Sequence, residues 1–248
     1  MASQLDCGYG RMAVVRGLSF SLAESEVVAL LGANGAGKTT TLLTLAGVLP
    51  ALGGRLEVLG TTVQGRRPHL LARRGLALVP QDRGLFGELS ARQNLELIPG
   101  PRSRRSGALA QVLDEFPSIS DFLDRKVGTL SGGQQQILAL ARALALAPRL
   151  LLVDELSLGL GPQLVERMLR TIRERATTAH MGVLLVEQHA AQALGVADRA
   201  LVLRHGELVL EARTADLRSR PELLESAYLG PSGQPPGIQP PARGEGER

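Results

Sequence analysis

Four short apolar runs recur along the chain, and each is continuous rather than alternating. A strand that is buried on one face alternates apolar and polar residues, whereas a strand covered on both faces is apolar throughout. The continuous runs therefore predict buried strands of a parallel sheet. They occupy Val27–Leu31, Leu76–Val79, Leu150–Val153 and Val183–Val186.

Stretches with helical character separate these runs: Lys38–Leu49, Gly133–Ala147, Gln163–Ala176 and Ala190–Ala197. Strands that alternate with helices indicate an α/β layer. Between Leu85 and Ala147 the pattern turns mainly helical. This predicts a helical subdomain inserted into the α/β core.

Antiparallel pairing is expected in two places. The opening residues Gln4–Val15 and Leu18–Leu22 suggest an antiparallel edge. Near the other end, Leu201–Leu203 and Leu208–Leu210 flank a short polar segment that contains Gly206, which predicts a hairpin.

Two segments rich in Gly, Pro and charged residues lack periodicity. Pro99–Gly107 is predicted to be a loop, and Pro231–Arg248 a disordered tail. The expected organisation is thus one domain over residues 1–230, with the helical subdomain at about 85–147, followed by a tail at 231–248.

Composition restricts the compartment. Aromatic residues are only 2% of the chain, so the core must consist of Leu, Val and Ala. No apolar run approaches the roughly 18–20 residues needed to span a bilayer, and the start carries no signal-peptide pattern, so a cytosolic protein is expected. Cys7 is the single cysteine, which excludes an internal disulfide and fits a reducing compartment.

The net charge of +4 raises the question of a nucleic-acid partner. The densest basic cluster, Arg102, Arg104 and Arg105, has no interleaved aromatic residue on which a base could stack. No nucleic-acid partner is therefore expected. Asp114 and Glu115, on a predicted helix, are interpreted as a solvated face.

A glycine-rich segment between the first buried strand and the next helix matches G-x-x-x-x-G-K-[ST]. Glycines allow backbone N–H groups to turn toward phosphate oxygens, and the helix N-terminus adds positive potential. Lys38, one of only two lysines in the chain, would bind the β- and γ-phosphates, and the Thr39 hydroxyl would bind Mg²⁺. The predicted nucleotide-binding residues of this P-loop are Gly32, Asn34, Gly35, Gly37, Lys38, Thr39 and Thr40.

Two carboxylates follow the strand Leu150–Val153. Asp154 ends the apolar run, where it would reach Mg²⁺ through water, and Glu155 would polarise the attacking water. An acidic strand end is weak support on its own. Together with Lys38 on a neighbouring strand, the pair predicts ATP hydrolysis.

A second anion-type site begins another predicted helix at Leu130-Ser131-Gly132-Gly133-Gln134. The plain alternative is a capped helix start. The segment resembles the LSGGQ signature of ABC ATPases, and the resemblance extends over nearly all of Leu5–Gly230. In that family two subunits pack head to tail, with each ATP between one P-loop and the opposite signature. The resemblance thus implies that Ser131, Gly132 and Gly133 contact the partner's nucleotide.

The same resemblance implies further roles. Tyr9 falls where the family stacks an aromatic ring on adenine. Gln81 falls at the Q-loop, where it would contact Mg²⁺ or the attacking water and relay nucleotide state to a membrane permease docked at Leu85–Leu97. Gln188 occupies the switch position that usually holds His; its amide can donate to a γ-phosphate but cannot carry a proton. His189 is the lesser candidate.

Three segments are similar to the subunits that drive branched-chain amino acid uptake: Ser157-Leu158-Gly159-Leu160, Val186-Glu187-Gln188 and Ala227-Tyr228-Leu229-Gly230. Leu160 replaces the usual Asp of the D-loop. Leu156 replaces the Pro that normally follows the catalytic Glu, and loss of that rigid φ is expected to loosen the water-positioning loop.

The resemblance implies an ATPase subunit at the cytoplasmic face of the membrane, in an importer for branched-chain or other hydrophobic amino acids. Its partners would be a second, homologous ATPase subunit, normally a different chain, the permease subunits and, indirectly, a solute-binding protein. Three alternatives stay open: a urea or amide importer ATPase, a soluble ABC ATPase outside transport, and a regulatory subunit that binds ATP but hydrolyses it weakly.

Overall fold

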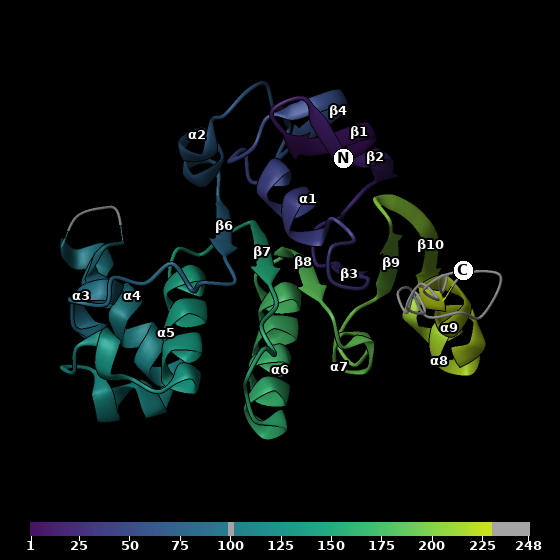
Figure 1. Cartoon of the computed structure of the whole chain (residues 1–248). Coiled ribbons are helices and arrows are strands. Elements are labelled where there is room, and N and C mark those ends of the chain that lie inside the picture. Colours follow the sequence, from purple (N-terminus) through teal and green to yellow (C-terminus); the bar gives the residue numbers. More distant parts are fainter. Residues whose placement is uncertain (99–101, 230–248) are drawn as a thin grey trace, which may run out of the picture.

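Figure 1 shows two β-sheets with one helix between them and most of the other helices beyond the larger sheet. The computed structural model describes residues 1–98 and 102–229. The larger sheet has the strand order β10-β9-β3-β8-β7-β6. Its strands are β3 (Val27–Leu31), β6 (Leu76–Val79), β7 (Leu150–Asp154), β8 (Gly182–Glu187), β9 (Arg199–Arg204) and β10 (Glu207–Arg213). The four strands expected from apolar runs are confirmed, and so is the hairpin β9–β10.

The register of β3 explains why its sequence is apolar throughout. It pairs in parallel with β8 and β9 and is therefore central. Val27, Ala29 and Leu31 belong to one hydrophobic core, whereas Val28 and Leu30 belong to a second core on the other side of the sheet. A strand that supplies two cores has no polar face.

The smaller sheet has the order β2-β1-β4-β5 and is antiparallel. Its strands are β1 (Ala2–Tyr9), β2 (Met12–Phe20), β4 (Ala51–Val58) and β5 (Thr61–Thr62). The expected antiparallel pair is present, although the turn falls at residues 10–11 rather than after residue 15.

Strand β4 was not predicted, because Gly53 and Gly54 interrupt its apolar pattern. Gly54 has a φ of +75°, and a Cβ there would lie 2.0 Å from the Gln4 carbonyl oxygen. Because β1 passes so close, position 54 requires glycine, and this glycine is what interrupts the apolar pattern of β4 in the sequence.

The helices are α1 (Lys38–Leu45), α2 (Pro68–Arg73), α3 (Ala91–Glu96), α4 (Arg102–Glu115), α5 (Gly132–Leu144), α6 (Pro162–Thr178), α7 (Ala190–Leu194), α8 (Thr214–Ser219) and α9 (Pro221–Leu229), with 3₁₀ turns η1 (Pro117–Phe122) and η2 (Val127–Thr129). The four predicted helices are confirmed as α1, α5, α6 and α7. From α3 to α5 the chain is helical and packs at one side of the larger sheet (Figure 1). No helix within residues 1–98 and 102–229 is long and apolar enough to cross a bilayer.

The loop predicted at Pro99–Gly107 is wrong for residues 102–107, which form the start of α4. Arginine is a good helix former, and the buried Val112 and Phe116 hold the later turns against the core. Packing therefore outweighs the Gly- and charge-rich composition. Residues 99–101, and the tail predicted at 231–248, lie outside the described residues.

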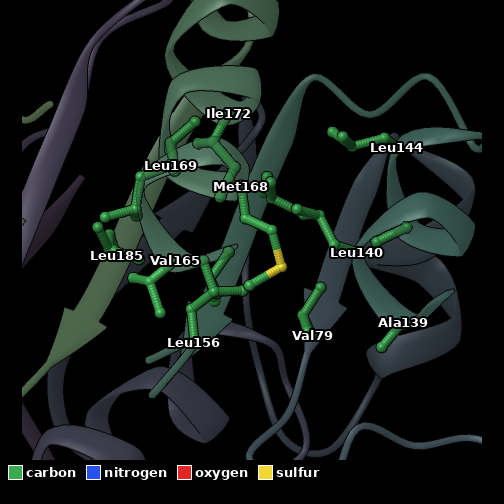
Figure 2. Packing of buried hydrophobic residues seen from close by; sticks show 14 of the residues in the cluster. Val79, Ala139, Leu140, Leu144, Leu156, Val165, Met168, Leu169, Ile172 and Leu185 are labelled. Carbon is green, nitrogen blue, oxygen red and sulfur yellow. The ribbon is translucent and has the colours of Figure 1, made fainter. Parts of the chain in front are cut away.

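Helix α6 packs by an apolar face and is tied to α4 by an ion pair. Figure 2 shows Met168 of α6 reaching toward Leu140 of α5, with the fully buried Leu156 close by. Glu115 of α4 forms an ion pair with Arg175 of α6, with 3.0 Å between Glu115 Oε1 and Arg175 Nε. The expected solvated face is therefore wrong for Glu115, and burial raises the pKa of its carboxyl although Arg175 opposes the shift.

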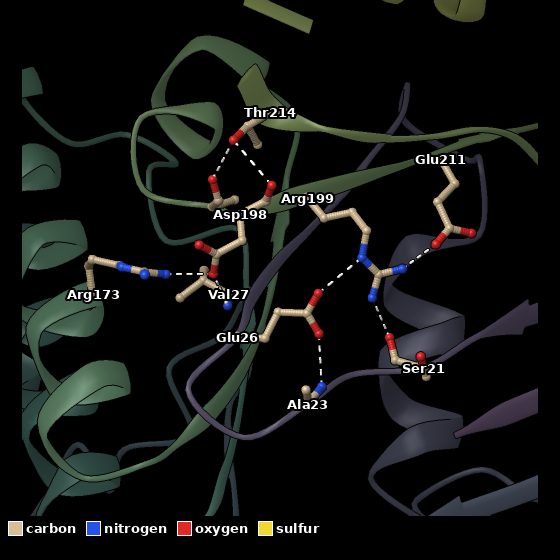
Figure 3. A network of polar contacts seen from close by, with 10 residues as sticks. Ser21, Ala23, Glu26, Val27, Arg173, Asp198, Arg199, Glu211 and Thr214 are labelled. Carbon is tan, nitrogen blue, oxygen red and sulfur yellow. Dashed lines mark hydrogen bonds and ion pairs between the residues drawn. The ribbon is translucent and has the colours of Figure 1, made fainter. Parts of the chain in front are cut away.

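A network of polar contacts lies at the amino end of β3 (Figure 3). Arg199 donates to Glu26 at 3.0 Å and also to Glu211 and the Ser21 carbonyl oxygen. Asp198 accepts from Arg173 at 2.6 Å and from the Val27 amide at 2.9 Å. The network joins β3, β9, β10 and α6 at the amino ends of β3 and β9, away from the carboxyl end of β3.

Replacement Arg199→Ala should lower the free energy of unfolding by about 2–3 kcal/mol, because it leaves the half-buried Glu26 carboxylate without its cation. The control Arg170→Ala removes an exposed ion pair to Glu166 and should cost less than about 0.5 kcal/mol. Urea titration measures both values. Equal costs for the two variants would contradict this account of the network.

Candidate functional site

The loop at residues 32–37 joins β3 to α1, and two of its glycines pass close to neighbouring atoms. Gly32 has a φ of +152°, and a Cβ there would lie 2.3 Å from the Leu203 carbonyl oxygen. Gly37 caps α1 with a φ of +102°, and its Cβ would lie 2.3 Å from Val15 Cγ2. The loop therefore needs glycine at both positions, which leaves its backbone N–H groups accessible at the start of the helix.

Lys38 begins α1 and is only 4% exposed. Its Nζ donates to the carbonyl oxygens of Gly32 at 2.9 Å and Ala33 at 3.2 Å. It also lies 3.8 Å from Glu155 Oε1. Burial lowers the pKa of Lys38, and the carboxylates of Glu155, Asp154 and Glu187 oppose that shift. The ammonium is thus held within the loop by weak carbonyl acceptors.

Asp154 ends β7 and is 2% exposed. Its Oδ1 has no hydrogen-bond partner among the described residues. Burial raises the pKa of Asp154, while the Thr39 side chain and Lys38 lower it. A buried carboxylate oxygen without a donor, next to a hydroxyl, fits the oxygen ligands that Mg²⁺ prefers.

Glu155 directly follows Asp154 and adopts a left-handed backbone conformation with a φ of +49°. Its amide donates to the Val186 carbonyl oxygen at 2.9 Å, which ties it to β8. Its Oε2 accepts a hydrogen bond of 2.9 Å from Gln81 Nε2. Glu155 thus lies between Gln81, which follows β6, and Lys38 of α1.

These residues surround a hollow of about 500 Å³. It is lined by Tyr9, Val14, Asn34, Gly35, Gly37, Lys38, Thr39, Thr40, Gln81, Glu155, Leu158 and Gln188. The structure therefore brings together most of the residues expected around a nucleotide. Gln188 reaches the hollow from the end of β8, whereas the exposed His189 is not among the lining residues.

The signature segment does not line this hollow. Ser131 is the N-cap of α5, where its Oγ accepts from the Gln134 amide at 3.3 Å and Gln134 Oε1 accepts from the Ser131 amide at 3.0 Å. Ser131 and Gly132 are exposed, and Gly133 is half-buried. The capped helix start is thus real, and the three residues face a different region from the P-loop of their own chain.

Two arginines outside the sequence motifs connect the segment after Gln81 to α5. Arg83 donates to Gln135 Oε1 at 2.7 Å and to Gln136 Oε1 at 3.0 Å. Arg142 of α5 donates to the Gly84 carbonyl oxygen at 2.7 Å. These bonds tie the segment after Gln81 to the helix that carries the signature. The sequence feature that could have indicated these contacts is the run of three glutamines, Gln134–Gln136, after Gly133.

Comparison with known proteins agrees with this geometry. The family model described as ABC transporter matches residues 15–157. The high-affinity branched-chain amino acid transport ATP-binding protein BraG of Pseudomonas aeruginosa is 38% identical over 90% of this chain and 95% of its own length. The lipopolysaccharide export system ATP-binding protein LptB of Acidithiobacillus ferridurans is 34% identical over 92% of this chain and 95% of its own.

The fold gives the same result. A solved structure described as the ATP binding subunit of an ABC transporter superposes with a TM-score of 0.80, at 27% identity, over 92% of this chain and 97% of its own. The fold and site define a P-loop ATPase of the cassette type. The chain belongs to the ABC transporter family, as an ATP-hydrolysing subunit that works with a partner ATPase and permease subunits.

The replacement Arg83→Ala should lower the free energy of unfolding by about 1–2 kcal/mol, because it removes the donor from the buried Gln136 amide oxygen. The exposed Arg73 of α2 provides a control, since Arg73→Ala should change stability by less than about 0.5 kcal/mol. Urea unfolding checks both variants, and an unchanged Arg83→Ala midpoint would refute the proposed connection.

Proposed function

We propose that MgATP binds in the hollow beside Lys38 and is hydrolysed there with Glu155 as the general base. The observation that carries the proposal is the convergence of one buried ammonium and two carboxylates at the carboxyl ends of neighbouring parallel strands. Lys38 follows the loop after β3. Asp154 ends β7 and Glu155 follows it, two strands away with β8 between them. This edge of an α/β sheet is where ligands bind in such folds.

Binding of the triphosphate would replace the present partners of Lys38. The ammonium now donates to two carbonyl oxygens, which are weaker acceptors than phosphate oxygens. The amides of Gly35 and Gly37 would donate to the phosphates, and Asn34 and Thr40 line the same hollow. Tyr9, which lines the hollow and is half exposed, would stack its ring on adenine.

Thr39 and Asp154 would hold Mg²⁺, with Gln81 as a further oxygen ligand. The unpartnered Oδ1 of Asp154 supports this assignment. The ion would supply positive charge next to the β- and γ-phosphate oxygens.

Glu155 would accept a proton from the attacking water. In the present structure its carboxylate is bound by Gln81 and lies near Lys38. Phosphate would draw Lys38 away, leaving one carboxylate oxygen of Glu155 available to orient water. The Gln188 amide would donate to the γ-phosphate, where it stabilises charge without transferring a proton.

The signature residues would complete the site of a second ATPase subunit. Ser131, Gly132 and Gly133 lie outside the hollow of their own chain, and the amides at the start of α5 form an anion-binding end. ATP would then bridge two subunits, and its cleavage would release them. The partner is expected to be a homologous but different chain.

A permease would dock at residues 85–97, which follow Gln81. Phe86 is 56% exposed and Leu97 is 51% exposed. The buried Asn94 holds Phe86 from both sides, since its Oδ1 accepts from the Phe86 amide and its Nδ2 donates to the Phe86 carbonyl oxygen. A rigid backbone that presents an apolar ring suits a protein interface. Docking there would place the chain at the cytoplasmic face of a membrane.

We infer that the transporter imports branched-chain or other hydrophobic amino acids, with a solute-binding protein as an indirect partner. Three of the similar proteins, BraG, BraF and LivF, are named for branched-chain amino acid transport, which supports this solute class. Uptake of labelled leucine by cells with and without the gene tests this solute. Uptake of labelled urea, measured in the same cells, tests the alternative of a urea importer.

The replacement Glu155→Gln should retain ATP affinity within about threefold and lower steady-state hydrolysis by about 10²- to 10³-fold, because the amide cannot accept a proton. Lys38→Ala should instead weaken ATP binding by about 30- to 100-fold. Calorimetry measures binding and phosphate release measures turnover. A wild type that binds ATP but already hydrolyses as slowly as Glu155→Gln would favour a regulatory subunit.

The replacement Phe86→Ser should reduce co-purification with the co-expressed permease by about tenfold, because it removes the apolar anchor. Stability should hold, since the ring is exposed. Met12→Ser is the control, as Met12 is 70% exposed on β2. Equal permease recovery with both variants would place the docking surface elsewhere.

A further inference from the structure

One buried carboxylate near the site has no role in the proposed mechanism. Glu187 is the last residue of β8 and is 1% exposed. Among the carboxylates that the structure describes, Asp154 and Glu187 are the ones classed as buried. A buried carboxylate is costly unless specific partners compensate it, so its contacts show what it holds.

Both oxygens of Glu187 bind the same residue. Oε1 accepts from the Ser157 amide at 3.1 Å, and Oε2 accepts from Ser157 Oγ at 2.6 Å. Within the described residues no cation lies within ion-pair distance of this carboxylate. Burial raises the pKa of Glu187, and the two bonds from Ser157 act against that rise. The partner that compensates Glu187 is therefore Ser157.

The contact fixes the segment that carries Glu155. The Glu155 amide donates to Val186 of β8, and Ser157 two residues later binds Glu187 of the same strand. Leu156 between them is fully buried in the core. The end of β8 thus holds the segment on both sides of Leu156.

The restraint matters because Glu155 has an unfavourable backbone conformation. A non-glycine residue at a φ of +49° persists only where its surroundings enforce it. A proline at position 156 would fix one φ angle in this segment, but leucine occupies it. The amide of Leu156 also lacks a backbone partner that could serve instead among the described residues.

We propose that Glu187 is a positioning residue, which clamps Ser157 and thereby holds Glu155 in its water-orienting geometry and Leu158 at the rim of the hollow. The clamp replaces the backbone restraint that proline would provide at position 156. Since Gln188 follows Glu187 directly, the same strand end positions the base and the γ-phosphate donor together. This inference rests on the proposed role of Glu155.

Three variants of the full chain test the clamp. Glu187→Met keeps a similar volume but has no oxygen that could accept from the Ser157 amide or hydroxyl. Ser157→Ala loses only the hydroxyl bond, and Ser157→Thr retains it. ATP turnover should fall about tenfold in the first two variants and stay within about twofold in Ser157→Thr. ATP affinity should change by less than about twofold in all three.

The double variant separates one shared contact from two independent roles. Glu187→Met with Ser157→Ala should lose no more turnover than the worse single variant, because both changes break the same contact. Multiplied losses would overturn the proposal. So would wild-type turnover in Glu187→Met, or a loss confined to ATP affinity.

Thermal unfolding excludes a purely structural explanation. Glu187→Met removes a buried charge at similar volume, so its melting temperature should hold or rise while turnover falls. Glu166→Gln, a change at an exposed carboxylate of α6, should leave turnover unchanged. Glu155→Gln is measured in parallel. Retained hydrolysis there would refute the role of Glu155 itself, whereas an inactive Glu155→Gln with a fully active Glu187→Met would refute only the clamp.

Discussion

The site depends on keeping one ammonium charged inside the protein. Lys38 is nearly inaccessible, yet it is surrounded by carbonyl oxygens and three carboxylates rather than by a single strong partner. Its charge is thereby tolerated while its hydrogen bonds stay exchangeable. The parallel sheet makes this arrangement possible, because parallel strands end at the same edge and bring distant parts of the sequence within a few ångströms.

Sequence reasoning succeeded where local pattern and buried position agree. The run at Val27–Leu31 predicts β3 with its observed bounds, since a central strand that serves two cores must be apolar at every position. The glycine spacing of the loop could also be read from the sequence, because it reflects the steric limits seen at Gly32 and Gly37, whereas the nucleotide contacts of the loop stay a prediction.

The remainder depended on tertiary contacts that no local pattern encodes. Strand β4 forms because it pairs with β1, despite its glycines. The first turns of α4 depend on packing further along the helix, where Val112 is buried. At the site, the Arg83 contacts and the Glu187–Ser157 contact join residues 52 and 30 positions apart. The sequence places Glu187 beside Gln188 but cannot show that its side chain turns toward the segment after Glu155.

The ion pair between Glu115 and Arg175 affects how the helical region meets the sheet. Interdigitated apolar side chains, such as those between α5 and α6, resist sliding because any shift opens voids. A charge pair stretches gradually and can take in water as it does so. A displacement of the helical region would therefore cost more at the α5–α6 contact than at the Glu115–Arg175 pair.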